Sequence, residues 1–455
     1  MSTAKPVADA DWRLRLEEGR ALVRLAAPIT LIALVNMGMS VTDAVMVSAL
    51  FGTDAFAAVA VGSDFYSIVF YLSAGTLGGV APFYTAAVTR ADKDERARLE
   101  RIGWMMVGLL AVLTVPLVWL APVWLERFGL DPGLLAQSQG YTRAMALTLI
   151  PMLGVMLYRT ILTAAEKPKV FLKVTLAMLP LNAVANYVLM TGAGPFPALG
   201  PTGAGVATLL VAAASLAVLA IIARRTASGG SAPFRAEASL DWRRMVAVLR
   251  VGIPIGIATV TEVGIYLAAT LYAARLGAAD VAAHTLTLRT AGIAYAVPAA
   301  LLQASMVRMA RAENLEDARA GQAVIASSLG LSLILGAAIF LLLAGTAAPL
   351  AGSFFDDSAA GGAAAQIALG LLLLLGLIEL VANPGLAAAG LLRGRKDTRA
   401  PMVYVLLGYW IVSAPLGVYL CEVQEMGILG IWLGLATGTL ATAALTLARL
   451  LAGRR

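Results

Sequence analysis

The feature that most constrains this chain is a series of twelve apolar stretches, each long enough to cross a bilayer as a helix of about 20 residues. The chain is 60% hydrophobic and only 13% charged, whereas a soluble chain is about 25% charged. Most of its surface must therefore face lipid, and we expect an all-α membrane protein with twelve transmembrane helices. The stretches are residues 21–50, 56–87, 102–125, 139–165, 170–191, 203–223, 246–276, 281–308, 321–350, 363–392, 401–421 and 427–450.

The basic residues indicate how these helices are oriented. All but five of the 34 Lys and Arg residues lie in or beside the termini and the loops after even-numbered stretches. By the positive-inside rule, both termini face the cytoplasm of a bacterial inner membrane. The same distribution explains the net charge of +7 without a nucleic-acid partner. The exceptions are Arg127, Arg143, Arg159, Arg275 and Arg289.

The two halves of the chain resemble each other. Residues 25–29 around Pro28 match residues 251–255 around Pro254, at an offset of 226, and the offset is 225 a little further on. An offset of six helices predicts two six-helix lobes related by a pseudo-twofold axis along the membrane normal, which suits alternating access. The alternative is that Ala/Leu/Gly-rich helices are alike by composition. The expected parts are a cytoplasmic segment (1–20), an N-lobe (21–223), a linker (224–245) and a C-lobe (246–455).

Ionisable groups inside spans are costly and therefore mark functional sites. Asp43 lies about 10 Å below the outer end of its span by the rise of an α-helix. Asn182 and Asn186 share one helix face because they are four residues apart, and Thr208 has a matching depth. These oxygens suit Na⁺, and the carboxylate alone suits a proton. The two asparagines alternatively serve only to bond neighbouring helices.

Glu262 and Glu379 both fall near mid-bilayer. Two carboxylates at one depth can share a proton or clamp a cation, which predicts a second coupling site. Glu379 alternatively pairs with another polar neighbour.

Asp64 and Arg289 occupy equivalent positions in the repeat, 225 residues apart and at equal depth. We expect them to meet across the lobes as a gate or to line the substrate cavity. The alternative is that each pairs within its own lobe.

Pro28 is a candidate hinge because proline kinks a helix, or else it is a static packing kink. Aromatic residues including Tyr66, Tyr266 and Tyr295 are candidates for lining a substrate cavity, and ordinary packing is the alternative. We expect His284 to be an interfacial side chain rather than a proton relay.

Several segments together resemble the multidrug and toxic compound extrusion (MATE) family, and its NorM-like branch more than the DinF-like one. They are residues 41–46 (VTDAVM), 203–208 (GAGVAT), 261–263 (TEV), 282–284 (AAH) and 392–398 (LRGRKDT). The resemblance spans residues 20–450. It implies a V-shaped, two-lobe antiporter that exports organic cations in exchange for H⁺ or Na⁺, with ion sites around Asp43 and Glu262.

One position departs from the NorM-like pattern. That branch carries an aspartate where this chain has Ala382, and Glu379 lies three residues earlier on the same helix face, with Asn383 as the other polar neighbour. Loss of that hard ligand favours coupling to protons over Na⁺.

Other functions find little support in the sequence. The chain has no P-loop pattern, and its single Cys421 and single His284 exclude a disulfide framework and argue against a histidine-ligated metal centre. We therefore expect a monomeric transporter rather than an enzyme, without a cofactor and without a metal beyond Na⁺ at Asp43 or Glu262. The alternatives are a lipid-linked sugar flippase of related fold and a membrane-embedded hydrolase.

Overall fold

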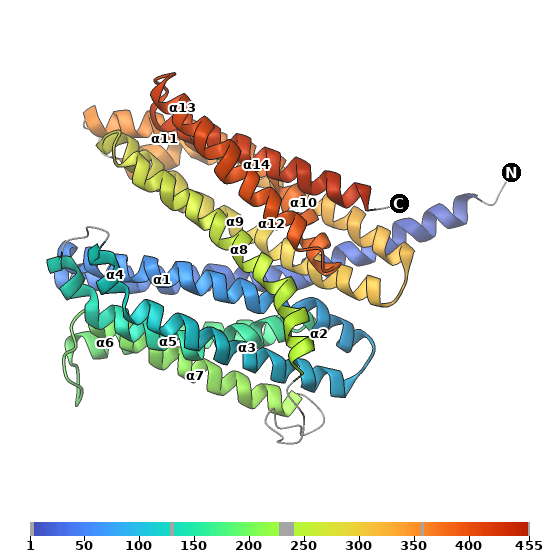
Figure 1. Ribbon diagram of the computed structural model, residues 1–455. Coiled ribbons are helices and arrows are strands. Elements are labelled where there is room, and N and C mark those ends of the chain that lie inside the picture. Colours follow the sequence, from blue (N-terminus) through green and yellow to red (C-terminus); the bar gives the residue numbers. More distant parts are fainter. Residues whose placement is uncertain (1–3, 128–131, 227–240, 356–358, 454–455) are drawn as a thin grey trace. The chain divides into compact units, whose positions relative to one another are not determined.

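The computed structural model describes residues 4–127, 132–226, 241–355 and 359–453, and every regular element within these ranges is a helix (Figure 1). The predicted linker (224–245) and N-terminal segment (1–20) are therefore described only in part. The elements are α1 (Ala4–Gly78), α2 (Val80–Thr89), α3 (Lys93–Trp119), α4 (Ala121–Arg127), α5 (Pro132–Ala164), α6 (Pro168–Thr191), α7 (Thr202–Thr226), α8 (Trp242–Ala273), α9 (Ala278–Asn314), α10 (Ala318–Phe354), α11 (Ala359–Gly394), α12 (Arg399–Leu406), the π-helix η1 (Leu407–Ser413), α13 (Ala414–Glu422) and α14 (Gly427–Ala452).

Twelve helical segments in the described ranges are long and apolar enough to cross a membrane, which confirms the predicted number of spans and the all-α class. Element α1 contains two of them, because its helix turns at Gly52, where φ is 83°. A left-handed φ of this kind favours glycine. Two spans are composite: α2 completes the second, and α12, η1 and α13 together form the eleventh.

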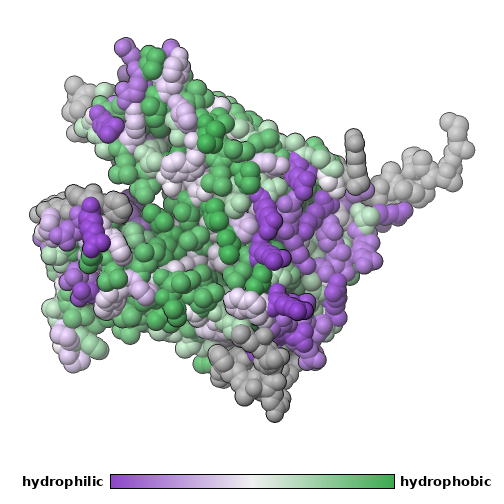
Figure 2. Space-filling model, in the orientation of Figure 1, coloured by the Kyte–Doolittle hydropathy of each residue, from purple (hydrophilic) through white to green (hydrophobic). Residues whose placement is uncertain are grey.

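The helix flanks are apolar and the helix ends are polar. Figure 2 shows hydrophobic side chains over the flanks, while hydrophilic side chains gather where helices end. Many buried threonine and serine hydroxyls donate within their own helices; for example, Thr148 donates to the Ala144 carbonyl and Thr287 to the Ala283 carbonyl. The surface and the internal hydrogen bonding are those of a protein solvated by lipid.

The chain forms two compact units, Leu31–Gly256 and a second unit made of Met1–Thr30 with Ile257–Arg455. The start of α1 thus belongs with the second half of the chain. Within that unit, Glu18 and Arg308 form a bidentate ion pair (Nε–Oε2 2.9 Å, Nη2–Oε1 2.6 Å), and both side chains are largely buried. Leu22, Leu25 and Ile29 pack in one cluster with apolar residues of α9 and α10.

Small residues bring helices into close contact inside the unit 31–256. A Cβ placed on Gly75 would lie 2.6 Å from the Gly256 Cα, and one placed on Gly79 would overlap the backbone of Gly252. A Cβ on Gly252 would in turn overlap the Thr76 carbonyl oxygen. This contact holds the start of α8 against the end of α1, as small residues do between membrane helices.

Gly252→Ala should therefore lower the thermal unfolding midpoint of the purified protein, because overpacking a close contact costs about 1–3 kcal/mol. Gly108→Ala in α3 is the matched control, because a Cβ there meets no atom within 4 Å. Equal unfolding midpoints for the two variants would contradict this packing.

Candidate functional site

Asp43, Asn182 and Asn186 meet inside the unit 31–256. The Asn182 amide nitrogen donates to Asp43 Oδ1 at 2.6 Å, and the Asn186 amide nitrogen donates to the same oxygen. Both asparagines are fully buried, on one face of α6, whereas Asp43 is partly buried on α1. Two amide donors therefore stabilise one carboxylate within an apolar bundle.

The amide oxygens at this site have no hydrogen-bond donor among the residues that the structure describes. Oδ1 of Asn182 and Oδ1 of Asn186 are buried and make no hydrogen bond with the described part of the chain. Thr208, expected at the same depth, donates its hydroxyl to the Ala204 carbonyl at 2.9 Å. The side chains joined directly to Asp43 are thus the two asparagines, and their free oxygens remain available to a cation.

Tyrosines extend this polar site. Tyr141 on α5 is buried, shares a side-chain hydrogen bond with Ser63 and lies within electrostatic range of Asp43 and Asp64. Tyr66 packs in the same cluster, and its hydroxyl is buried without a hydrogen-bond partner in the described chain. The sequence did not single out Tyr141, because a tyrosine in an apolar helix is usually a packing residue.

A second polar cluster lies in the other unit, around Glu262 on α8. The Tyr295 hydroxyl donates to Glu262 Oε2 at 3.3 Å, and Arg393 on α11 is an electrostatic neighbour of the same carboxylate. Glu379 is buried beside Asn383 and interacts electrostatically with Glu262. Ala382 packs against the apolar core one turn away.

The π-helix η1 brings two aromatic residues to this cluster. Tyr409 lies against Tyr266 with ring centroids 6.4 Å apart, and its hydroxyl is 3.4 Å from Thr439 Oγ1. Trp410 donates its indole N–H to the Thr261 carbonyl at 3.3 Å. A π-helical segment of this kind often marks a functional site.

His284 is fully buried, so its expected interfacial position is wrong. Its Nδ1 accepts a hydrogen bond from the Trp432 indole at 3.1 Å, and its Nε2 lies 2.9 Å from Thr270 Oγ1. Because an indole nitrogen only donates, Nδ1 carries no proton and the imidazole is held in one tautomer. Trp432, 148 residues away in the chain, gave no sequence signal of this contact.

The remaining predicted residues lie apart from these two clusters or at their edges. Asp64 and Arg289 are exposed and belong to different compact units, so their predicted meeting stays a prediction. Pro28 is buried in α1, two residues before the chain passes from one unit to the other. The backbone of α1 stays helical there.

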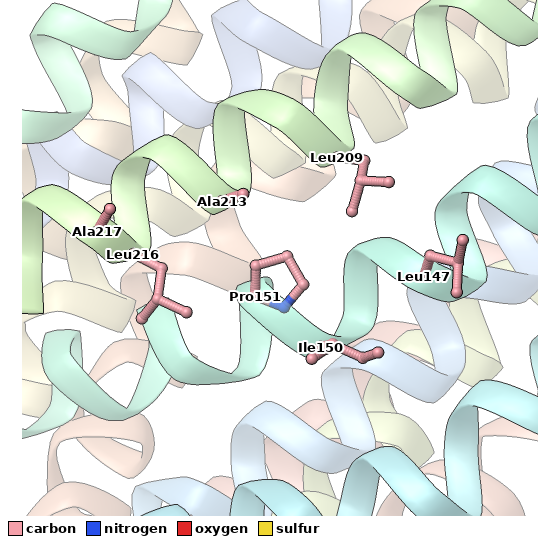
Figure 3. Close-up of a pocket in the computed structure, with 7 residues that line it drawn as sticks. All are labelled: Leu147, Ile150, Pro151, Leu209, Ala213, Leu216 and Ala217. Atoms are coloured by element: carbon pink, nitrogen blue, oxygen red, sulfur yellow. The ribbon is translucent and has the colours of Figure 1, made fainter.

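The groove between α5 and α7 is apolar throughout, and Figure 3 shows its lining residues. It offers no group for acid–base or ion chemistry. No group of three or more His, Cys, Asp or Glu side chains that would hold a metal ion occurs among the residues whose structure is described. The lining residues are Leu147, Ile150, Pro151, Leu209, Ala213, Leu216 and Ala217.

The fold is that of MATE transporters. A eukaryotic MATE transporter, AtDTX14, superposes with a TM-score of 0.84 at 17% identity, and the alignment covers 96% of each chain. A multidrug resistance MATE family transporter in an outward-facing conformation gives a TM-score of 0.85 at 16% identity, again with 96% of each chain covered.

The sequence establishes the family directly. The MatE family model matches residues 28–188 and 254–419, two segments that begin 226 residues apart, as the internal repeat does. The chain belongs to the MatE family of transporters, and the NorM-like resemblance is confirmed. A probable multidrug resistance protein NorM from Rhizobium meliloti (strain 1021) is 32% identical over 434 residues, covering 94% of this chain and 92% of that protein. The corresponding protein of Burkholderia mallei (strain ATCC 23344) is 33% identical over 431 residues, covering 93% and 90%.

Proposed function

We propose that this protein is a secondary antiporter that exports organic cations or other toxic compounds in exchange for H⁺ or Na⁺ by alternating access. It works as a monomer in a bacterial inner membrane with both termini in the cytoplasm, and it needs no cofactor. The family and the NorM relatives support efflux. The observation that carries the coupling mechanism is the Asp43 carboxylate, held inside a helix bundle by Asn182 and Asn186.

The two asparagines suit an exchange of occupants at Asp43. Their amide nitrogens stabilise the carboxylate when it is empty. Rotating each amide by half a turn would present oxygen instead, and oxygen accepts a hydrogen bond from a protonated carboxyl or coordinates Na⁺. The same three side chains thus accommodate a charged, protonated or metal-bound Asp43. We keep Thr208, on the adjacent helix α7, as a proposed member of this site.

Glu262 and Glu379 form the proposed coupling site of the second unit. Tyr295 donates a hydrogen bond to Glu262, and Arg393 places a positive charge near it. The electrostatic neighbours of the two carboxylates within the described ranges include no third carboxylate. Ala382 adds no oxygen ligand. A carboxylate pair without a third hard ligand favours protons over Na⁺.

Asp64 and Arg289 are proposed as a gate or as part of the substrate path, with Tyr66, Tyr266 and Tyr295 lining the cavity and Pro28 serving as the hinge. Both charged side chains are exposed, so each is accessible to a partner or a substrate. The alternatives, a flippase for lipid-linked sugars or a hydrolase, receive no support from relatives that are named multidrug resistance proteins.

Asp43→Asn should abolish gradient-driven efflux of ethidium from proteoliposomes. The neutral carboxamide cannot take up a proton, and it offers no negative charge to Na⁺. The variant should still fold, since amide–amide hydrogen bonds replace the present ones. Circular dichroism and gel filtration provide the folding control. Efflux by this variant at the wild-type rate would rule out Asp43 as the coupling residue.

The coupling ion should be the proton. Proteoliposomes with an imposed pH gradient and no Na⁺ should accumulate ethidium, whereas an imposed Na⁺ gradient without a pH gradient should not drive uptake. Uptake that follows only the Na⁺ gradient would reverse this assignment and make Asn182 and Asn186 metal ligands.

The gate is tested by exchanging its charges. Asp64→Arg and Arg289→Asp should each reduce efflux, because each change replaces the attraction between the two side chains with a repulsion between like charges. The double variant should recover most of the activity. A double variant no more active than either single variant would show that the two side chains do not pair.

A further inference from the structure

A cavity of about 690 Å³ opens in the unit made of Met1–Thr30 and Ile257–Arg455, far from the Glu262 cluster along the helices. Its walls come from the end of α9, the start of α10, the start of α1, the turn after α11 and the end of α14. Small-molecule sites have volumes of about 300–1,000 Å³. Because α9 and α10 are both membrane spans, a cavity at their junction lies at the level where lipid headgroups meet water.

The polar walls of this cavity are held in place by hydrogen bonds. Ser327 of α10 donates to the Arg15 carbonyl at 2.8 Å, which fixes this part of α1 against α10. Nε of Arg395 donates to Glu313 Oε1 at 2.8 Å. Asp317, at the turn from α9 to α10, accepts hydrogen bonds from two backbone N–H groups at the start of α10, both at 3.0 Å. The cavity is therefore shaped by contacts that the chain makes with itself.

Two lining side chains of opposite charge are left over. None of the ion pairs within the described ranges includes Arg15 or Glu316, and both residues are exposed. Gln322 adds a neutral amide to the same lining. A ligand that carries both an anion and a cation complements this lining, because an ion of one sign alone would be repelled by one of the two charges.

The cavity continues into an apolar stripe along α10. Ile325 and Ala326 line it beside Gln322, and Leu333 lies about three turns beyond Gln322 on the same helix face. Leu333 is 52% exposed, so this face of α10 is open to acyl chains. A ligand with a charged head in the cavity and an apolar tail along α10 would find a matching surface for both parts.

We propose that this cavity binds the headgroup of phosphatidylethanolamine, with Arg15 taking the phosphate and Glu316 the ammonium group. A guanidinium presents a planar fork of N–H donors that matches phosphate oxygens, and a primary ammonium offers three N–H donors to a carboxylate. The bound headgroup would bridge the start of α1 to the turn between α9 and α10. This lipid site goes beyond the proposed efflux function and does not depend on it.

Lipids with identical acyl chains and different headgroups test the assignment. The delipidated full-length protein is titrated with phosphatidylethanolamine, phosphatidylglycerol or phosphatidylcholine, and native mass spectrometry gives the apparent Kd of the first bound lipid. The wild type should bind phosphatidylethanolamine about tenfold or more tightly than phosphatidylcholine, whose trimethylated ammonium has no N–H donor. Tenfold is the usual effect of losing a charged hydrogen bond.

The two variants should differ in which lipid they affect. Arg15→Gln should weaken phosphatidylethanolamine and phosphatidylglycerol about tenfold each, because both carry the phosphate. Glu316→Gln should weaken phosphatidylethanolamine about tenfold and change phosphatidylglycerol by less than about twofold, because the glycerol headgroup has no ammonium.

Arg20→Gln and Glu17→Gln are the matched controls. They remove the same charges from exposed positions on α1, and neither residue is among the described residues that line the cavity. Both should bind phosphatidylethanolamine within about twofold of the wild type. Equal wild-type affinity for phosphatidylethanolamine and phosphatidylcholine, or phosphatidylethanolamine binding that is unchanged in Arg15→Gln or Glu316→Gln, would overturn the proposal. The wild-type comparison needs no variant, so a variant that fails to fold leaves the test intact.

A headgroup without acyl chains separates a lipid from a soluble ligand. Glycerophosphoethanolamine carries the same phosphate and ammonium groups, and it should bind about tenfold or more weakly than phosphatidylethanolamine because it leaves the apolar stripe of α10 uncovered. Equal affinity for the two molecules would assign the cavity to a soluble zwitterion and overturn the proposal. None of these measurements involves transport, so their failure is distinct from a failure of the proposed efflux function.

Discussion

The hydrogen bonds from Asn182 and Asn186 to Asp43 are the interaction on which this account depends. A carboxylate among apolar helices costs several kcal/mol unless donors or a cation balance it. Two amide nitrogens supply part of that balance, and a proton or Na⁺ supplies the rest. Because the compensation is divided between the protein and an ion, the occupancy of the site can depend on the gradients across the membrane.

The surrounding bundle is built to hold such a site in place. Many threonine and serine hydroxyls bond within their own helices, and glycines allow helices to touch at Gly75, Gly79, Gly252 and Gly256. The start of α1 is fixed separately, by Glu18 and Arg308, to the unit formed by the second half of the chain. Asp43 therefore lies on a helix whose two portions belong to different compact units, with Pro28 close to the boundary.

Hydropathy and residue spacing were sufficient to predict some parts of the structure. The twelve spans followed from length and apolar content, and the convergence of Asp43 with Asn182 and Asn186 followed from counting helix turns from the membrane surface. Both features depend only on the position of each residue along its helix axis. One family model matches residues 28–188 and 254–419, in agreement with the internal repeat. The repeat was predictable because its aligned prolines and glycines are visible in the sequence.

Contacts that depend on the rotation of a helix about its axis were not predictable. Lipid and protein interior are both apolar, so hydropathy does not say which face of α9 turns inward, and the burial of His284 against Trp432 was missed. The placement of Tyr409 and Trp410 by η1 was missed likewise. Thr208 donates its hydroxyl to the Ala204 carbonyl, so its part in the Asp43 site stays a prediction.

If Asp43 exchanges a proton for substrate, the release of protons on substrate binding measures this exchange most directly. Rhodamine 123 is added to the purified protein in weakly buffered, Na⁺-free solution, and the protons released per bound dye are counted with a pH indicator. We predict proton release by the wild type and a clear reduction of that release in Asp43→Asn at equal dye occupancy. The same proton count for both proteins would contradict it.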